Sequence, residues 1–213
     1  MPLHRYFIRT PWLVQKLFPR YTWRMPADRK EVYLTFDDGP HPVITPWVLE
    51  QLKFYHAKAT FFCIGNNVER YPEIYRQILD EGHAVGNHTY RHLRGWATED
   101  AVYLQDVEKA AALIRSPLFR PPYGRIRAGQ AKKIPEILKN PAAKIIMWDV
   151  LSADFDPGCS PAECLGHVTR NVRAGSIVVF HDSEKAFKNL ETALPGSLKF
   201  LKEKGFQLKS LLE

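Results

Sequence analysis

Cysteine is scarce in this sequence, and its scarcity excludes the small disulfide-built folds. Only Cys63, Cys159 and Cys164 occur in 213 residues, and an odd count rules out a framework in which every cysteine pairs within one chain. Cys159 and Cys164 are close together, but the sequence offers no matching pair elsewhere to complete a zinc cluster. We therefore interpret all three as reduced packing residues, with Cys63 in the apolar run TFFCIG belonging to the core.

Long apolar runs are also missing, and no segment approaches the roughly 20 residues of a transmembrane helix. The opening stretch MPLHRYFIRTPWLVQKLFPRYTWRM lacks the continuous apolar core and the small-residue cleavage site of a secretory signal. It mixes basic residues with aromatic and aliphatic ones, so contact with a membrane interface is one interpretation. We favour the other, in which residues 1–29 are an N-terminal extension that packs on one domain over residues 30–213.

Dense clusters of one charge are absent as well. The chain has 30 Lys and Arg against 23 Asp and Glu, a net charge of +7. That balance suits an anionic polymer or surface as partner. However, the sequence shows no run of basic residues, no Gly-rich phosphate loop and no recognisable nucleic-acid-binding module. We therefore predict no nucleic-acid partner.

The sequence does contain a regular alternation of short apolar runs and helical patterns. Strands are predicted at 31–36, 59–65, 83–88, within 117–124, and at 143–150, 176–180 and 206–212, and helices at 45–56, 68–82, 98–116, 126–140, 160–175 and 184–204. Strands that alternate with helices indicate a parallel sheet with crossover helices. Either an open doubly wound sheet or an incomplete barrel would satisfy this pattern.

A few residues predict where helices begin or break. Thr98 and Ser160 are expected N-caps, and Pro161 follows Ser160 at the first helical position. Pro135 should interrupt the helix that contains it, and the last helix should break near Pro195.

Polar residues gather where the predicted strands end, which is where both candidate folds place their sites. In chain order they are Asp37 and Asp38, His88 and His92, Arg120 and Tyr123, Asp154, and His181 with Asp182. Each has an ordinary explanation when taken alone, such as a solvated turn, a chance histidine pair, a rigid proline turn or a satisfied core histidine. Their convergence on one edge of the sheet is stronger evidence, and it predicts a site there.

The residue types at this edge indicate a metal site. His88 and His92 are four residues apart, which would place both imidazoles on one face of a helical turn. An aspartate at a neighbouring strand end would complete a set of two histidines and one carboxylate with open positions for water. In LTFDDGPHP, one of the two adjacent aspartates could bind the cation while the other acts as a base. His181 is the candidate acid.

The motifs TFDD, HTYRH, RPPYG, DF and FHD occur in this order. Together they resemble the successive motifs of the polysaccharide deacetylases with the NodB homology domain, carbohydrate esterase family 4. The resemblance covers about residues 30–213 and implies a distorted (β/α)7 barrel. It also implies a hydrolase that uses Zn²⁺, Co²⁺ or another divalent ion to remove N-acetyl groups from N-acetylglucosamine units. An N-acetylated glycan would be the partner, and we expect a monomer.

The resemblance also implies roles for single residues. Asp37 would be the general base, and Asp38, His88 and His92 would hold the metal ion. Arg120 would orient Asp37 and keep it ionised.

Four further residues complete the implied site. The backbone N–H of Tyr123 would stabilise the oxyanion. His181 would protonate the departing amine while Asp154 fixes its tautomer. Thr89 would support the loop between the metal-binding histidines.

Three positions depart from the family pattern and bear on substrate preference. Leu151 stands where an aspartate is usual, and Phe155 stands where a tryptophan is usual. Val179 replaces a leucine that lines the pocket for the acetyl methyl group. O-acetyl esters and cyclic amides therefore stay open as substrates, and so does a glycan-binding domain without catalysis. The complete set of base, ligands and acid argues against the last.

Cell location is an open expectation. Family members usually work outside the cytoplasm, whereas this sequence shows no clear export signal. The sequence predicts the cytoplasm or the inner membrane surface, with the cell envelope as the alternative.

Overall fold

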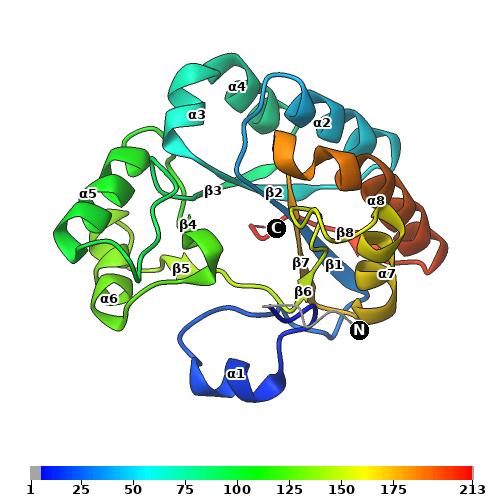
Figure 1. Ribbon diagram of the computed structural model, residues 1–213, viewed down its shortest axis with the longest axis horizontal. Coiled ribbons are helices and arrows are strands. Elements are labelled where there is room, and N and C mark those ends of the chain that lie inside the picture. The colour runs from blue at the N-terminus through cyan, green and yellow to red at the C-terminus, as the bar shows by residue number, and fades with distance from the viewer. Residues whose placement is uncertain (1–5, 213) are drawn as a thin grey trace.

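The computed structural model describes residues 6–212, which form a curled sheet surrounded by helices (Figure 1). The sheet has eight strands: β1 (Glu31–Asp37), β2 (Ala59–Cys63), β3 (Ala84–Asn87), β4 (Leu118–Phe119), β5 (Lys144–Ile145), β6 (Val150–Leu151), β7 (Ser176–His181) and β8 (Gln207–Leu208). Their order is β5-β4-β3-β2-β1-β7-β6, β8 pairs with β1, and all pairings are parallel. This architecture confirms the expected distorted (β/α)7 barrel.

Helices surround the sheet: α1 (Trp12–Leu17), α2 (Ile44–Phe54), α3 (Gly65–Arg70), α4 (Pro72–Asp80), α5 (Asp100–Ala111), α6 (Ala128–Ile137), α7 (Pro161–Asn171), α8 (Glu184–Glu203) and the 3-10 turn η1 (Pro122–Gly124). In Figure 1, α2, α3 and α4 lie along one side, α5 and α6 along a second, and α7 and α8 along a third, while α1 stands apart below them. None of the helices within residues 6–212 combines the length and apolar composition needed to span a bilayer.

Strand β1 occupies the middle of the sheet, which explains its nearly unbroken apolar sequence. Phe36 stacks against Phe61 and Phe180 with ring centroids 5.0 Å and 5.9 Å apart. This stacking favours the observed register of β1 against β7, because a one-residue slip would turn Phe36 to the opposite face of the sheet, away from Phe180. In that register Asp37 lies beside His181, so packing of the core sets the positions of two predicted site residues.

The prediction of a single strand at 143–150 is wrong. Its two ends lie on opposite edges of the curled sheet, as β5 and β6, and the residues between them cross from one edge to the other. The N-terminal segment pairs with this crossing. Met147 donates its backbone N–H to the carbonyl of Thr22 at 2.8 Å, and Leu151 donates to Ile8 at 2.8 Å. The curl leaves backbone groups without a neighbouring strand, and residues 8–22 satisfy several of them.

The prolines break helices at other positions than predicted. The helix predicted at 68–82 is divided, because Pro72 lacks an N–H and disfavours helical backbone at Tyr71, whose φ and ψ are −132° and 60°. Pro135 and Pro195, in contrast, stay inside α6 and α8. Buried residues on both sides of Pro195 pack that helix into the core, and this packing holds it together across the missing hydrogen bond.

One predicted cap is confirmed and the other is wrong. The Ser160 hydroxyl accepts the N–H of Glu163 at 3.3 Å, and the Glu163 carboxylate accepts the N–H of Ser160 at 2.8 Å. This capping box begins α7. At α5 the N-cap is Glu99 rather than Thr98, and within the described chain no side chain caps that helix end.

Candidate active site

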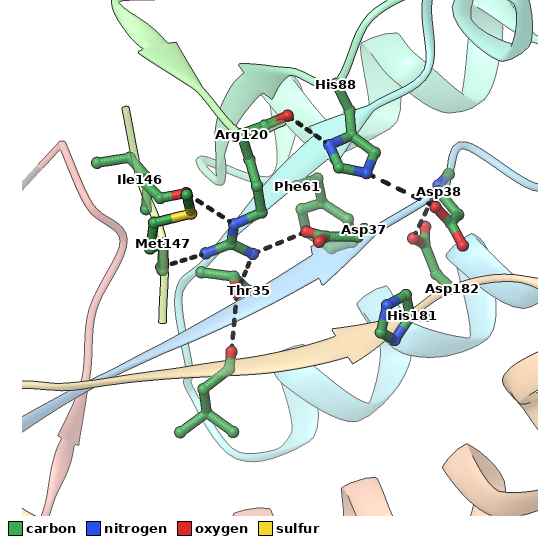
Figure 2. A network of polar contacts seen from close by, with 12 residues as sticks. Thr35, Asp37, Asp38, Phe61, His88, Arg120, Ile146, Met147, His181 and Asp182 are labelled. Carbon is green, nitrogen blue, oxygen red and sulfur yellow. Dashed lines mark hydrogen bonds and ion pairs between the residues drawn. The ribbon is translucent and has the colours of Figure 1, made fainter. Parts of the chain in front are cut away.

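Asp37 ends β1 against a buried arginine (Figure 2). The Arg120 side chain is 0% exposed, and its Nη1 donates to Asp37 Oδ1 at 2.7 Å and to the Thr35 hydroxyl at 2.7 Å. Its Nε and Nη2 donate to the carbonyls of Ile146 and Met147 at 3.2 Å and 3.0 Å. Burial alone would raise the pKa of Asp37, but the charge and hydrogen bond of Arg120, together with the charges of His88 and His181, outweigh it and the pKa is lowered. Asp37 is therefore ionised at neutral pH.

Asp38 turns away from this arginine and faces two imidazoles. Its Oδ1 lies 3.8 Å from Nε2 of His88 and 3.2 Å from Nε2 of His92. That oxygen is buried, and it has no hydrogen-bond partner among residues 6–212. Donor atoms of the three residues all lie within 4.8 Å of one another. A buried carboxylate oxygen without a donor, aimed at two imidazole nitrogens, fits a divalent cation held by two histidines and a carboxylate.

Both histidines have the protonation state that a metal ion requires. Burial lowers the pKa of His88, and burial lowers the pKa of His92 to about 4. Both imidazoles are therefore neutral at neutral pH. Nδ1 of His88 lies 2.7 Å from the carbonyl oxygen of Arg120, so this nitrogen carries the proton and Nε2 presents its lone pair toward Asp38.

The histidine pair does not share a helical turn, so that part of the prediction is wrong. Residues 88–92 form an irregular loop after β3, in which Thr89 and His92 have positive φ angles of 63° and 58°. The N–H of Thr89 donates to the side-chain oxygen of Asn87 at 2.8 Å, and its carbonyl accepts the N–H of Gly65 at 2.9 Å. These bonds hold the loop in a non-helical conformation, and this conformation brings the two imidazoles together.

His181 ends β7 and is held by Asp154. Its Nδ1 lies 2.8 Å from Oδ1 of Asp154, and its backbone N–H donates to Oδ2 at 2.8 Å. Burial would lower the pKa of His181, but the charge and hydrogen bond of Asp154, together with the charges of Asp38 and Asp37, outweigh that effect and raise the pKa to about 9. In the absence of a metal ion, His181 is therefore protonated at neutral pH.

Asp182 is a buried residue to which sequence reasoning assigned no task. Its carboxylate accepts the backbone N–H of Gly39 at 3.0 Å and the hydroxyl of Thr45. A Cβ at Gly39 would lie 2.0 Å from this carboxylate, so only glycine fits there. Burial raises the pKa of Asp182 to about 8. Asp182 thus fixes the turn after Asp38, and the Gly-Pro step after the aspartates was the signal that could have indicated such an anchor.

Aromatic rings border the site on two sides. The Tyr123 side chain is 51% exposed, and its ring centroid lies 4.7 Å from that of His92. Its φ of 60° gives the RPPYG turn a left-handed residue. On the other side, the ring of Phe155 lies 5.1 Å from the ring of His181. Aromatic faces of this kind bury apolar area while leaving an open edge for a polar ligand.

The structure brings the predicted residues together at one end of the sheet. Asp37, Asp38 and His181 come from the ends of β1 and β7, and His88 and His92 from the loop after β3. A curled parallel sheet with this arrangement of carboxylates and imidazoles defines the class of NodB-like α/β deacetylases.

Comparisons with known proteins agree with this class. The family model for polysaccharide deacetylase matches residues 24–137. A peptidoglycan-N-acetylglucosamine deacetylase of Bacillus cereus is 34% identical over 200 residues, which cover 90% of this chain and 91% of the relative. A chitooligosaccharide deacetylase of Azorhizobium caulinodans is 34% identical over 170 residues, 75% of this chain and 77% of the relative.

A solved structure shares the whole fold. It is the peptidoglycan N-acetylglucosamine deacetylase Bc1960 in complex with 4-naphthalen-1-yl-N-oxidanyl-benzamide, with a TM-score of 0.84, 31% identity and 95% coverage of both chains. The chain therefore belongs to the polysaccharide deacetylase family, and it is a hydrolase of the deacetylase class.

Proposed function

We propose that this protein is a metal-dependent N-deacetylase of N-acetylglucosamine units in peptidoglycan-type polymers or chitooligosaccharides. The observation that carries the proposal is that two adjacent carboxylates, Asp37 and Asp38, face different partners. Asp37 is fixed and kept ionised by Arg120, whereas Asp38 points its unpaired oxygen at His88 and His92. The names of the Bacillus cereus and Azorhizobium caulinodans relatives support the substrate class.

Asp38, His88 and His92 would hold Zn²⁺ or another divalent ion. When bound, such an ion polarises a carbonyl oxygen and lowers the pKa of a coordinated water. Asp37 lies next to these three ligands. Because its pKa is lowered, its carboxylate is ionised and can accept a proton from the attacking water. Arg120 acts as a positioning residue, because it bonds Asp37 without facing solvent.

His181 supplies the proton for the leaving group. The water oxygen bonds to the acetamide carbonyl carbon, the C–N bond breaks, and His181 Nε2 delivers a proton to the departing amine nitrogen. Asp154 holds Nδ1, so Nε2 is the nitrogen that faces the reaction. The backbone N–H of Tyr123 is the proposed donor to the oxyanion. The products are acetate and a free amino sugar.

The departures from the family pattern lie around the acyl side of the site. Leu151 and Val179 are register partners in β6 and β7, and both are buried. Val179 precedes His181 by two residues and therefore shares its face of the strand. A small apolar side chain there suits an acetyl methyl group. This wall would accept an O-acetyl ester equally well, so O-acetyl glycans are the second candidate, and cyclic amides the third.

The proposal is tested by acetate release from N-acetylglucosamine oligomers and peptidoglycan fragments. Protein stripped of metal should be inactive, and Zn²⁺ or Co²⁺ should restore activity. Asp37→Asn should bind the metal normally yet lose at least about 100-fold in rate. Asp38→Asn, the matched neighbour, should fail to bind it.

Two outcomes would contradict this assignment. Full activity in Asp37→Asn would remove the proposed base. Metal-loaded protein that releases acetate from O-acetyl esters but from no N-acetyl glycan would replace the N-deacetylase with an esterase.

We also propose that the N-terminal segment contacts an anionic membrane surface. It presents exposed apolar side chains together: Phe7 (60% exposed), Trp12 (66%), Leu13 (55%), Leu17 (66%) and Phe18 (50%). The sequence has no acidic residue before Asp28, so basic and apolar groups are presented together, as interfacial segments present them.

Co-sedimentation with anionic vesicles tests the membrane contact. A Trp12→Ser, Leu17→Ser variant should bind about tenfold more weakly. Phe54→Ser removes a ring from α2 that is even more exposed, at 76%, and this variant should bind like wild type. Wild-type protein that stays in solution at low salt, or equal losses in both variants, would contradict this contact.

A further inference from the structure

Cys159, Cys164 and His167 form a second group of ligand-type side chains. Cys159 lies just before α7, and Cys164 and His167 lie one turn apart on that helix. One donor atom from each of the three residues lies within 4.8 Å of the other two. Cys164 is fully buried and Cys159 nearly so. The sequence analysis found no further ligand for these cysteines, because the helical conformation of α7 is what brings His167 beside them.

The imidazole is oriented as in a metal-bound histidine. Nδ1 of His167 lies 2.9 Å from the carbonyl oxygen of Ser152, so Nδ1 carries the proton and Nε2 carries the lone pair. Metal-ligating histidines commonly donate their other N–H to a backbone carbonyl in this way. Cys-x4-Cys-x2-His therefore supplies two sulfurs and one nitrogen, a donor set that favours Zn²⁺ and similar thiophilic ions.

The surroundings of the cluster favour a cation. Asp156 and Glu163 both interact unfavourably with an ionised Cys159, and Asp154 does the same with Cys164. A divalent ion would reverse this penalty, because it stabilises the thiolates and offsets the nearby negative charge.

Geometry leaves room for a tetrahedral site. Zn²⁺ bonds of roughly 2.0–2.3 Å place ligand atoms roughly 3.3–3.8 Å apart, so donors within 4.8 Å need to close by at most about 1.5 Å. The hydroxyl of Tyr6 lies 3.7 Å from Cys159 Sγ and bonds the carboxylate of Asp156. Tyr6 of the N-terminal segment thus lies against the cluster, between Cys159 and Asp156.

We propose that Cys159, Cys164 and His167 bind a thiophilic divalent ion of the Zn²⁺ class, at a site distinct from Asp38, His88 and His92. The bound ion fastens the loop over residues 152–160 to α7. That loop carries Asp154, whose N–H donates to the Ser152 hydroxyl at 3.3 Å and whose carboxylate holds His181. The ion therefore has a structural task, which is to keep this loop in place beneath the proposed acid. The proposal does not depend on the proposed reaction.

Co²⁺ titration of the reduced, metal-stripped full chain tests the site, because thiolate ligands give Co²⁺ a near-ultraviolet charge-transfer band that carboxylates and imidazoles do not. We expect two ions per chain and a thiolate band. The His88→Ala, His92→Ala double variant should keep the band and bind one ion. The Cys159→Ser, Cys164→Ser double variant should lose the band and also bind one ion, whereas Cys63→Ala, the control at the third cysteine, should behave like wild type.

Thiol alkylation keeps the test independent of cysteine variants that fail to fold. In the His88→Ala, His92→Ala background, Zn²⁺ should slow alkylation of Cys159 and Cys164 at least tenfold and leave Cys63 unchanged. The proposal is overturned by a single ion per chain that the His88→Ala, His92→Ala variant loses, or by a band that survives when both Cys159 and Cys164 are replaced by serine. Alkylation that Zn²⁺ does not slow, or a Cys159–Cys164 disulfide formed in place of metal binding, would also overturn it.

Discussion

At the residue scale, Arg120 sets the state of the proposed base. A fully buried guanidinium would be costly if it had no partner, but each of its three nitrogens donates to an oxygen atom, from Asp37, Thr35, Ile146 or Met147. The pair is therefore mutually dependent. Each charge is tolerable in the interior only because the other is present, and the carboxylate stays ionised as a consequence.

This dependence predicts a non-additive stability effect. Arg120→Met should lower the free energy of unfolding by about 3–5 kcal/mol, since Asp37 is left buried without its cation. Adding Asp37→Asn should recover at least about 1 kcal/mol of this loss. Denaturant unfolding of the two single variants and the double variant gives the coupling directly. Strictly additive losses would show that the two side chains do not stabilise each other.

A second residue-scale prediction concerns pH. Because the folded-state pKa of His181 is raised to about 9, its pairing with Asp154 contributes fully below the unfolded pKa of about 6.5 and is lost as pH rises through about 9. We expect the stability advantage of metal-free wild type over Asp154→Asn to shrink by about 1–3 kcal/mol between about pH 7 and about pH 10. Denaturant unfolding at both pH values measures it. A constant difference would contradict the ion pair.

That the candidate site residues lie together was largely predictable, because the sequence shows both their chemical types and their order along successive strands. Aspartates and histidines at successive strand ends must converge in a parallel sheet, whatever the loops do. The loop geometry was not predictable in the same way. His88 and His92 meet through the positive φ angles at Thr89 and His92, which depend on the bonds to Asn87 and Gly65 rather than on spacing.

At the scale of single elements, the sequence predicted a helix end correctly where a side chain bonds the backbone of its own helix. Ser160 and Glu163 form the reciprocal cap of α7, so Ser160→Ala should cost about 0.5–2 kcal/mol. Thr98→Ala, the matched change before α5, should cost less than about 0.5 kcal/mol, because Thr98 does not occupy the N-cap. Thermal or urea unfolding measures both. Equal costs in the two variants would mean that the cap of α7 adds nothing.

The predicted boundaries of helices and strands were wrong where tertiary packing determines where an element ends. A helix ends before Pro72, which takes the first position of α4, where its missing N–H costs nothing, whereas Pro195 stays within α8 because that helix is anchored along its length by buried residues. The apolar run at 143–150 has the composition of one strand, but the curl of the sheet assigns its ends to different edges. A local pattern carries no information about such a curl.

At the scale of the whole molecule, the N-terminal segment completes the sheet rather than merely resting on it. Besides its backbone pairing with the crossing between β5 and β6, it supplies Arg24, whose Nε lies 3.1 Å from Oδ2 of Asp149. The side chain of Asp149 is 0% exposed and accepts the N–H of Ile177 at 2.9 Å. A cation from the extension thus compensates a carboxylate buried beside β7.

The extension also offers a matched pair of arginines to test this. Arg24→Met should lower the free energy of unfolding by about 1–3 kcal/mol, because the buried carboxylate of Asp149 loses its nearer cation and, among residues 6–212, is left with Arg173 at 3.9 Å. Arg29→Met removes a side chain that is 76% exposed and lies 4.0 Å from Glu31, so its cost should stay below about 0.5 kcal/mol. Both are measured by denaturant unfolding of the full chain. If Arg24→Met proves as harmless as Arg29→Met, the ion pair with Asp149 adds no stability, and the extension supports the sheet through its backbone pairing instead.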